Sequence, residues 1–499
     1  MSTGSAPVAR ELHAPHTAPH GAPHARAARA GEAPALLRAP FRWTQQDQKT
    51  LAVHTEGSVP DWLTGDLVRT APAVFGEGEW RAGHWFDGLA LIYGFSFDQG
   101  VAFRQELLAS KFAADVAAGR ARTASFDTTM KRGFFQRLVQ PVPQVTDNTN
   151  VNIVPWQGAW LAMTESQHQH VVGNDLVSRG LYRFEDALPT TMSLTAHPHM
   201  DFARSALVNL GATFGPKNEL WVVRQGSQGR AREVEGKLAL KRVPYLHSFG
   251  LSPKHAVVVD HPFSVNPLTL LWSNRGFIEH FKWEPERGTR LWKLRRDSGV
   301  WTDYQTDALF CFHTVNTFDD GDDVVIDFLA FDDPSAVAQL KTEQLLSGAL
   351  PPFLPRFVRA RLSPGKRHAE LELLSEQGFE LPNIAYRKQH GERYDTVWGA
   401  ALAEDGKQGW SSEIVRVDLG KATVARFSES QMTYGEPIFV PRPGAARADD
   451  GVVLTVGSHA VDERSVLAVL DASTLAPLAR CQVDLSIPLG FHGNYRGKQ

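Results

Sequence analysis

The sequence has few cysteines and no strong charge of either sign. Of its 499 residues only two are cysteines, Cys311 and Cys481, so neither a disulfide framework nor a cysteine-rich zinc site can organise the chain. Lysine and arginine number 52 and aspartate and glutamate 55, which gives a net charge of −3 and no overall basic footprint for nucleic acid. We therefore expect no nucleic acid partner, and a reducing cytoplasm as the default location.

The sequence also lacks a long apolar run. No stretch of about 18 apolar residues occurs, which is the length that a membrane-spanning helix needs. The N-terminus has no short apolar region behind a basic residue, so it does not resemble a secretory signal. These absences predict a cytoplasmic protein that does not span a membrane and at most contacts the inner face of one.

The first 38 residues differ in composition from the rest. They are rich in Ala, Pro, His and Arg, and Pro-His pairs recur every four residues from Pro15 to His24. Repeated prolines prevent a helix that could align the imidazoles. We expect residues 1–38 to be a disordered tail, with weak metal binding as the alternative, and residues 39–499 to form a single domain.

From residue 39 onward the chain is dense in short β-like runs, rich in Val, Ile, Leu, Phe and Trp and separated by turn residues. The clearest runs are 89–97, 101–108, 151–155, 220–223, 256–259, 324–331, 452–456 and 465–470. Helical patterns are few, and the clearest are 111–118 and 335–346, each with a glycine close behind. Many short strands without alternating helices predict a closed or radially repeated all-β architecture. Periodicity alone leaves barrel, sandwich and propeller open.

Four of the nineteen histidines lie in apolar or turn contexts near the ends of predicted strands. They are His197, His247, His313 and His492. Their separations match no local metal motif, but they suit a propeller in which successive blades each direct one residue to a common axis. For any one of them alone, a core or turn histidine is the more common explanation, and residue patterns do not show that the four meet.

If the four histidines meet, their chemistry is constrained. Four neutral imidazoles leave the full charge on a divalent ion, and imidazole suits iron, zinc, copper or nickel. Each ring needs an acceptor on its second nitrogen to hold one tautomer. Three glutamates in apolar strand contexts are candidates for that role: Glu165, Glu380 and Glu436. A turn hydrogen bond or a surface ion pair is the alternative for each.

At these residues the sequence resembles the carotenoid cleavage oxygenase family. Eight short motifs carry the resemblance, and they occur in the family's order across about residues 55–495. The motifs are Pro60–Gly65, His84–Gly88, Thr146–Asn152, Thr195–His199, His247–Pro253, Phe312–Asn316, Glu436–Val440 and Phe491–Gly493. One such motif would be weak evidence for the family, whereas eight motifs in the family's order are specific evidence.

The resemblance implies a seven-bladed β-propeller with a helical and loop cap over its metal-bearing face. It implies ferrous iron (Fe²⁺) bound by the four histidines, the three glutamates hydrogen-bonded behind them, and no catalytic residue beyond the metal ligands. The implied reaction uses O₂ to cleave one C=C bond of an apolar polyene into two carbonyl products. Phe312 and Val151 are the expected walls of the substrate tunnel beside the iron, with blade core as the alternative for Phe312.

The remaining histidines of interest have simpler explanations. His199 follows His197 by two residues and would face the opposite side of a strand. We expect a turn or packing role for His84, and surface-loop positions for His168 and His170.

Local residues favour one branch of the family. The stilbene-cleaving branch has a lysine just before its Asn-Thr-Asn segment, whereas Pro143–Asp147 has none. We therefore expect a carotenoid or apocarotenoid substrate and aldehyde products of the retinal type. The alternatives are a stilbene-cleaving dioxygenase, an O₂-independent isomerohydrolase of retinyl esters and a non-catalytic carotenoid-binding propeller.

Two segments bear on delivery of an apolar substrate. Met130–Leu138 mixes basic and aromatic residues, and Pro267–Trp283 is rich in Leu, Phe and Trp. Such faces suit a segment that lies on a bilayer without spanning it, and the resemblance places a nonpolar membrane-facing patch near both. Packing within the cap is the alternative.

Overall fold

The computed structural model describes residues 41–45, 50–120, 122–215, 217–347, 355–402 and 411–498. The predicted tail, residues 1–38, lies outside the described residues. The expected domain start at residue 39 lies outside them too, so that boundary stays a prediction.

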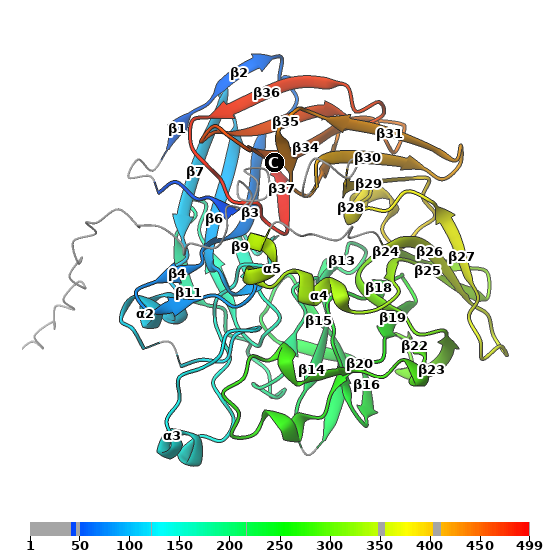
Figure 1. Cartoon of the computed structure of the whole chain (residues 1–499). Coiled ribbons are helices and arrows are strands. Elements are labelled where there is room, and N and C mark those ends of the chain that lie inside the picture. Colours follow the sequence, from blue (N-terminus) through cyan, green and yellow to red (C-terminus); the bar gives the residue numbers. More distant parts are fainter. Residues whose placement is uncertain are drawn as a thin grey trace, which may run out of the picture.

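Within the described ranges, seven antiparallel sheets of four to six strands follow one another round a ring in chain order (Figure 1). Blade 1 contains β1 (Leu51–Ala52), β3 (Gly65–Val74), β6 (Leu89–Phe97), β7 (Val101–Leu107) and β37 (Gly493–Gly497). Blade 2 contains β8 (Asn152–Trp156), β9 (Ala159–Met163), β10 (Gln169–Val172) and β11 (Ser178–Leu181). Blade 3 contains β12 (Ser193–Leu194), β13 (His199–Asp201), β14 (Ala206–Thr213), β15 (Asn218–Gly226) and β16 (Arg232–Leu240).

The ring continues with four more blades. Blade 4 contains β18 (Gly250–Leu251), β19 (His255–Asp260), β22 (Thr289–Arg295) and β23 (Val300–Thr306), and blade 5 contains β24 (Phe310–Asp320), β25 (Asp323–Phe331), β26 (Arg356–Leu362) and β27 (Leu371–Ser375). Blade 6 contains β28 (Glu380–Asn383), β29 (Thr396–Ala401), β30 (Glu413–Asp418) and β31 (Thr423–Ser428). Blade 7 contains β2 (His54–Gly57), β32 (Met432–Tyr434), β33 (Ile438–Pro441), β34 (Gly451–His459), β35 (Ser465–Asp471) and β36 (Pro477–Val483). The predicted seven-bladed propeller is confirmed.

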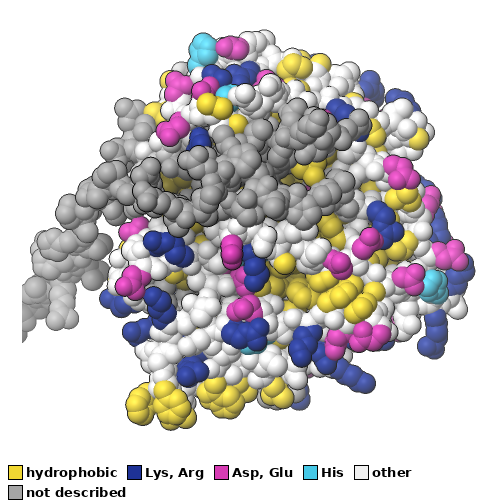
Figure 2. Space-filling model, viewed as in Figure 1, with side chains coloured by type: hydrophobic (Ala, Val, Ile, Leu, Met, Phe, Trp, Pro, Cys, Tyr) yellow, Lys and Arg dark blue, Asp and Glu magenta, His cyan; other side chains and the backbone are white. Residues whose placement is uncertain are grey.

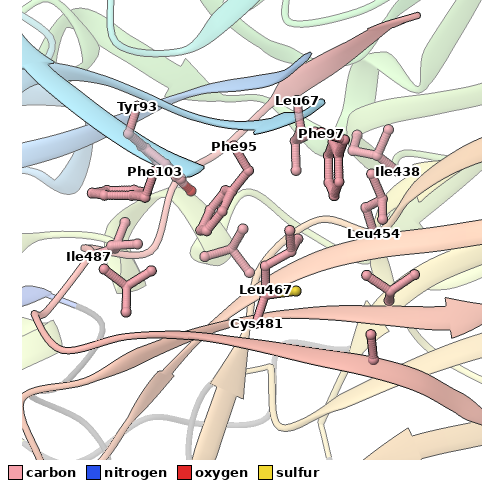
Figure 3. Packing of buried hydrophobic residues seen from close by; sticks show 14 of the residues in the cluster. Leu67, Tyr93, Phe95, Phe97, Phe103, Ile438, Leu454, Leu467, Cys481 and Ile487 are labelled. Atoms are coloured by element: carbon pink, nitrogen blue, oxygen red, sulfur yellow. The ribbon is translucent and has the colours of Figure 1, made fainter. Parts of the chain in front are cut away.

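Strand exchange between the two ends of the chain closes the ring. The late strand β37 pairs with β3 in blade 1, and the early strand β2 pairs with β36 in blade 7. Between these blades, Leu67 and Phe95 pack with Leu454, Leu467 and Cys481 in one apolar cluster (Figure 3). The exchanged strands therefore link the first and last blades, and the interface between these blades is buried.

Strand β6 illustrates why the predicted strands are continuous apolar runs. Its alternate residues Leu91, Tyr93 and Phe95 pack toward blade 7, whereas Ala90 and Ile92 pack toward blade 2. Successive side chains of a strand point to opposite faces, and in a propeller both faces of a blade are covered by neighbours. Burial on both faces replaces the usual alternation of apolar and polar residues.

A cap of short elements covers one end of the ring. It contains β4 (Gly76–Glu77), β5 (Trp80–Arg81), β17 (Val243–Pro244), β20 (Phe263–Val265), β21 (Phe281–Trp283), α2 (Lys111–Ala117), α3 (Phe134–Val139), α4 (Ser335–Gln339) and α5 (Thr342–Ser347), with the 3₁₀ helices Trp85–Asp87, Pro267–Leu270, Ile278–His280 and Pro285–Arg287. One further helix, α6 (Tyr386–Gln389), follows β28. An aromatic cluster that includes Trp85, Tyr245, Phe281, Phe312 and Phe491 joins the cap to the blades.

The two helix predictions have different outcomes. The helix at 111–118 is confirmed as α2, whose N-terminus is capped by Ser110 through the Ala113 amide. The single helix at 335–346 is wrong, because α4 ends at Gln339 and α5 begins at Thr342. The break has a physical cause: the Leu340 carbonyl accepts the Trp85 amide, and Lys341 forms a β-bridge with His84. In the part of the chain that the structure describes, no helix has the length and apolar character to cross a membrane.

Candidate metal centre

The four predicted histidines come from the inner edges of four different blades. His197 lies between β12 and β13, His247 precedes β18, His313 lies within β24, and His492 immediately precedes β37. The structure brings all four together, because one ring nitrogen of each lies within 4.8 Å of the corresponding atoms of the other three. The convergence that residue patterns alone left open is therefore present.

The nitrogens that face one another are the Nε2 atoms. His197 Nε2 lies 2.9 Å from His492 Nε2, and His313 Nε2 lies 3.2 Å from both His247 Nε2 and His492 Nε2. Nitrogens bound to one metal ion at about 2.1 Å lie about 3.0–3.4 Å apart. The spacing of the imidazoles therefore fits the coordination of one metal ion by these Nε2 atoms.

The second ring nitrogens are held by the three predicted glutamates and one carbonyl. His247 Nδ1 bonds to Glu165 Oε1 and His313 Nδ1 to Glu380 Oε2. His492 Nδ1 bonds to Glu436 Oε1 at 2.8 Å, and His197 Nδ1 lies 3.0 Å from the carbonyl oxygen of His247. These oxygens only accept hydrogen bonds, so each Nδ1 carries the proton and each Nε2 presents a lone pair. Four convergent lone pairs repel one another unless a cation lies between them.

Burial keeps three imidazoles of the cluster uncharged. Burial lowers the pKa of His247 to about 4, and it lowers the pKa values of His197 and His492 well below the usual 6.5, with the neighbouring imidazoles adding to the effect. Burial also raises the pKa of Glu436 to about 7, against the opposing pull of Arg69. The imidazoles of His197, His247 and His492 are therefore neutral at pH 7, which is the form that binds a metal ion.

Acidification is expected to destabilise the metal-free protein. Burial lowers the pKa values of ten imidazoles among the described residues. The pKa values of His84 and His261 fall to about 3 and those of His199 and His247 to about 4, and lower pKa values are also expected for His168, His197, His280, His390, His459 and His492. The unfolded chain binds protons near pH 6.5 that the folded chain excludes, so the free energy of unfolding falls as pH drops from 6.5 toward 4. Each group contributes about 1.4 kcal/mol per pH unit at most.

Thermal unfolding followed by circular dichroism tests this expectation. We expect the midpoint of the metal-free protein to fall by more than about 5 °C between pH 7 and pH 5. Five carboxyls act in the opposite direction, since burial raises the pKa of Asp87 to about 6, that of Glu436 to about 7, and those of Asp127, Asp260 and Asp327 above the usual value. A midpoint that is constant or rises on acidification would contradict neutral burial of the histidines.

An apolar cavity opens on one side of the histidine cluster. Val151 and Phe312 both line it, together with Phe86, Leu381 and Phe491. Apart from His247, His313, His492, Glu380 and Ser411, the lining residues are apolar, aromatic or glycine. A cavity of this kind suits a long apolar ligand whose reacting bond lies beside the histidines.

A second cavity reaches the cluster from the opposite side. His197, Pro198 and Glu436 line this axial cavity, and His313 and His492 border both cavities. The histidine cluster therefore separates an apolar space under the cap from a more polar space along the propeller axis.

The other histidines lie outside the cluster. His199 uses both ring nitrogens elsewhere, on Tyr386 Oη and on the Phe249 carbonyl. His84 is buried in a turn, where Nδ1 accepts the Phe86 amide and Nε2 donates to the Val337 carbonyl, as expected. The surface position expected for His170 is wrong, because its side chain is buried in β10.

His170 is buried because blade 2 supplies polar partners for it. Its Nδ1 lies 2.9 Å from Ser178 Oγ, and its Nε2 lies 3.5 Å from Asp147 Oδ2. The alternation of Gln and His around it resembles a polar surface run, so only the pairing of β10 with its neighbours reveals the burial.

Two residues of the centre were missed by sequence reasoning. Tyr245 Oη donates to Glu165 Oε1 at 3.0 Å and lies 3.3 Å from His247 Nδ1. Arg69 lies behind Glu436, with its Nη2 3.6 Å from Glu436 Oε2. The spacing of Tyr245, two residues before His247 on an extended segment, could have indicated a shared face. No comparable sequence pattern marks Arg69.

Comparisons with known proteins agree with this architecture. A model of the retinal pigment epithelial membrane protein family matches residues 41–497. The mitochondrial carotenoid-cleaving dioxygenase of Homo sapiens is 27% identical, with 92% of this chain and 90% of that protein covered. The β,β-carotene 15,15'-dioxygenase of Homo sapiens is also 27% identical, with 88% and 90% covered.

Solved structures show the same fold. A variant of the Synechocystis apocarotenoid oxygenase is 23% identical and superimposes with a TM-score of 0.83, covering 94% of this chain and 100% of that one. A cobalt-substituted form of the Synechocystis enzyme, also 23% identical, gives a TM-score of 0.81 over 93% and 98% of the two chains.

Proposed function

The chain belongs to the retinal pigment epithelial membrane protein family, and from this premise we propose that it is a non-haem Fe²⁺ dioxygenase that cleaves one C=C bond of a carotenoid or apocarotenoid. O₂ is the co-substrate and the products are aldehydes, of the retinal type where the substrate ends allow it. Relatives that are 27% identical over nine-tenths of their length are named carotenoid-cleaving and β-carotene dioxygenases, which supports the substrate class.

One observation carries the proposal: four imidazoles converge through their Nε2 atoms, and three of them line an apolar cavity. His197, His247, His313 and His492 would hold the iron, which when bound supplies the redox chemistry that activates O₂. Imidazole donors without a carboxylate ligand suit a divalent transition metal that keeps positions open for small molecules.

The protein groups around the centre hold the metal ligands and the substrate in place and do not react themselves. Glu165, Glu380 and Glu436 hold the histidine tautomers, so that every Nε2 is available. Phe312 and Val151 are the proposed contacts to the polyene and exclude water from the reacting bond. Which double bond is cleaved then depends on how deeply the polyene enters the cavity.

The direct test incubates iron-loaded protein with β-carotene, an apocarotenal and a hydroxylated stilbene, while O₂ uptake and aldehyde formation are measured. We expect O₂ consumption matched to aldehyde release from at least one of the two polyenes. Cleavage of the stilbene alone would favour the stilbene-cleaving alternative. Isomerisation without O₂ uptake would favour an isomerohydrolase, and binding without turnover would leave a carotenoid-binding protein.

Replacing Glu165 by glutamine is expected to weaken metal binding or activity by about 10–100-fold. The amide is a weaker acceptor than the carboxylate for His247 Nδ1, so the imidazole loses basicity and a fixed tautomer. Isothermal titration of the metal-free protein with Fe²⁺ or Co²⁺ measures the change. Glu413→Gln is the matched control, since Glu413 is similarly buried but pairs with Arg426 in blade 6. Equal losses in both variants would argue against a role of Glu165 at the metal.

We also propose that the α3 region contacts a membrane surface. Phe134, Phe135, Leu138 and Val139 of α3 expose 67%, 78%, 62% and 85% of their surface, and hydrophobic side chains gather at the edge of the molecule where α3 lies (Figures 1 and 2). Arg137 Nη1 donates to the Trp272 carbonyl, so this face joins the exposed Leu268 and Trp272 of the second predicted segment. By contrast, Ile278 and Phe281 of that segment are buried in the cap.

The double substitution Phe134→Ser and Phe135→Ser is expected to reduce binding to phosphatidylcholine–phosphatidylserine vesicles about tenfold or more, because two exposed aromatic rings are lost. Vesicle sedimentation measures the bound fraction. Val461→Ser serves as control, because Val461 is 60% exposed but lies in the turn after β34. If all three proteins bind equally, the patch is not a membrane contact.

A further inference from the structure

The three glutamates behind the histidines differ in one respect. Glu165 and Glu380 form ion pairs only with His247 and His313 among the described residues. Glu436 has a cationic neighbour as well, because Arg69 Nη2 lies 3.6 Å from its Oε2 and both side chains are almost fully buried. A buried guanidinium at this place needs an explanation, since an arginine is rarely buried without a partner.

Arg69 contacts the backbone on both sides of the His492–Glu436 pair. Its Nη1 donates to the Glu436 carbonyl at 3.0 Å, and its Nη2 donates to the Phe491 carbonyl at 3.3 Å. The next residue, Thr70, donates its amide to the His492 carbonyl at 3.1 Å. Strand β3 therefore fixes the segment that carries His492 to the segment that carries Glu436.

Two glycines leave room for this arrangement. A Cβ at Gly493 would lie 2.4 Å from Arg69 Cγ, and one at Gly490 would lie 2.2 Å from the Thr70 carbonyl oxygen. Neither glycine has a positive φ, so close approach to β3, rather than backbone conformation, explains both. A side chain at either position would displace Arg69 or the strand that carries it.

Charge gives Arg69 a second role. Around a divalent ion, the three glutamates carry three negative charges once Glu436 is ionised. The ion and Arg69 together carry three positive charges, so the assembly is neutral as a whole. Uncompensated charge in a buried site is costly. Among the described residues, Arg69 is the arginine or lysine that pairs with a glutamate of the centre.

We propose that Arg69 is a positioning residue of the metal centre: it supplies the counter-charge of Glu436 and fixes the His492–Glu436 pair at the strand that closes the ring. The inference rests on the metal centre proposed above and extends it to a residue outside the histidine and glutamate set. The arginine acts on the metal only through Glu436 and His492. Its effect on metal binding must therefore depend on the charge at position 436.

A double-mutant cycle tests this dependence with Co²⁺ as the probe. Metal-free wild type, Arg69→Met, Glu436→Gln and the double variant are titrated with Co²⁺ by calorimetry, and the visible absorption bands of bound Co²⁺ report the ligand geometry. We expect each single variant to bind about 10–100-fold more weakly and with altered bands. The double variant should lose less affinity than the sum of the two single losses, because a neutral side chain at 436 needs no counter-charge and only the backbone contacts of Arg69 remain to be lost.

A purely structural arginine would give a different pattern. Arg232→Met is the matched control, since Arg232 is buried and pairs with Asp186 in blade 3. It should lower the thermal midpoint and leave Co²⁺ affinity unchanged. Additive losses in the cycle, or wild-type affinity in Arg69→Met, would overturn the proposal. Arg69→Gln, which is also neutral but keeps an amide donor, replaces Arg69→Met in the cycle if the latter does not fold.

The outcomes for the two proposals are distinguishable. If the wild type itself binds no Co²⁺, the proposed metal centre fails. If the wild type binds Co²⁺ and Arg69 has no effect on affinity or bands, only the inference about Arg69 fails. If neither Arg69 variant folds while Arg232→Met does, Arg69 serves the fold rather than the centre, and the inference is overturned.

Discussion

Replacing His313 by alanine is expected to abolish metal retention and activity together while the propeller stays folded. His313 Nε2 lies 3.2 Å from the Nε2 atoms of both His247 and His492, so its loss removes the donor between two others. The Glu380 carboxylate also loses its imidazole partner. Metal content by mass spectrometry and O₂ uptake with a polyene measure the two effects, and far-ultraviolet circular dichroism checks the fold.

The control for this variant is His199→Ala. His199 is a partly buried histidine close in sequence to His197, but its ring nitrogens bond to Tyr386 and the Phe249 carbonyl. We expect His199→Ala to lose some thermal stability and to keep its metal. Full iron content together with activity in His313→Ala would remove His313 from the ligand set. Loss of metal in both variants would indicate that the cluster depends on general packing.

Replacing Val151 by phenylalanine is expected to lower kcat/KM by about 100-fold or more while metal affinity changes only a few-fold. Val151 lines the apolar cavity next to His492 and Phe491. The Val151 carbonyl accepts a hydrogen bond from the His492 amide, and the Val151 amide donates to the Met163 carbonyl. Neither bond involves the side chain. The phenyl ring of the variant fills space that the polyene needs beside the histidines. The polyene therefore no longer binds in the reacting position.

Two measurements separate this effect from damage to the centre. Co²⁺ titration of Val151→Phe should give nearly wild-type affinity, and steady-state assays should show the loss of turnover. Val151→Ala enlarges the cavity instead and should retain turnover within a few-fold. Wild-type turnover by a metal-loaded Val151→Phe would mean that the substrate reaches the histidines by another route, such as the axial cavity.

The strands of this fold could be predicted because burial on both faces of each blade leaves a continuous apolar signal. The run at 89–97 coincides with β6, and 324–331 lies within β25. The helix prediction at 335–346 failed because tertiary contacts decide that segment. The apolar spacing of its residues fits one helix, but the contacts of Leu340 and Lys341 with the His84 turn divide it.

The candidate site was only partly accessible from residue patterns. His197, His247, His313 and His492 were each recognisable as unusual, but their meeting depends on the closure of seven blades, and the motif resemblance supplied that step. Arg69 is a single arginine inside an apolar run, which a sequence pattern treats like any exposed strand residue. Its partner Glu436 is far away in sequence, so only the pairing of β3 with β37 shows what the guanidinium contacts.

The order of strands has a consequence for how the protein is made. His492 is carried by the segment that leads into β37, and β37 follows every other described strand in the chain. Until β37 has been synthesised, the chain offers only three of the four imidazoles, and β3 lacks its last neighbour. Binding of one ion by all four imidazoles therefore requires that β37 has formed and paired with β3.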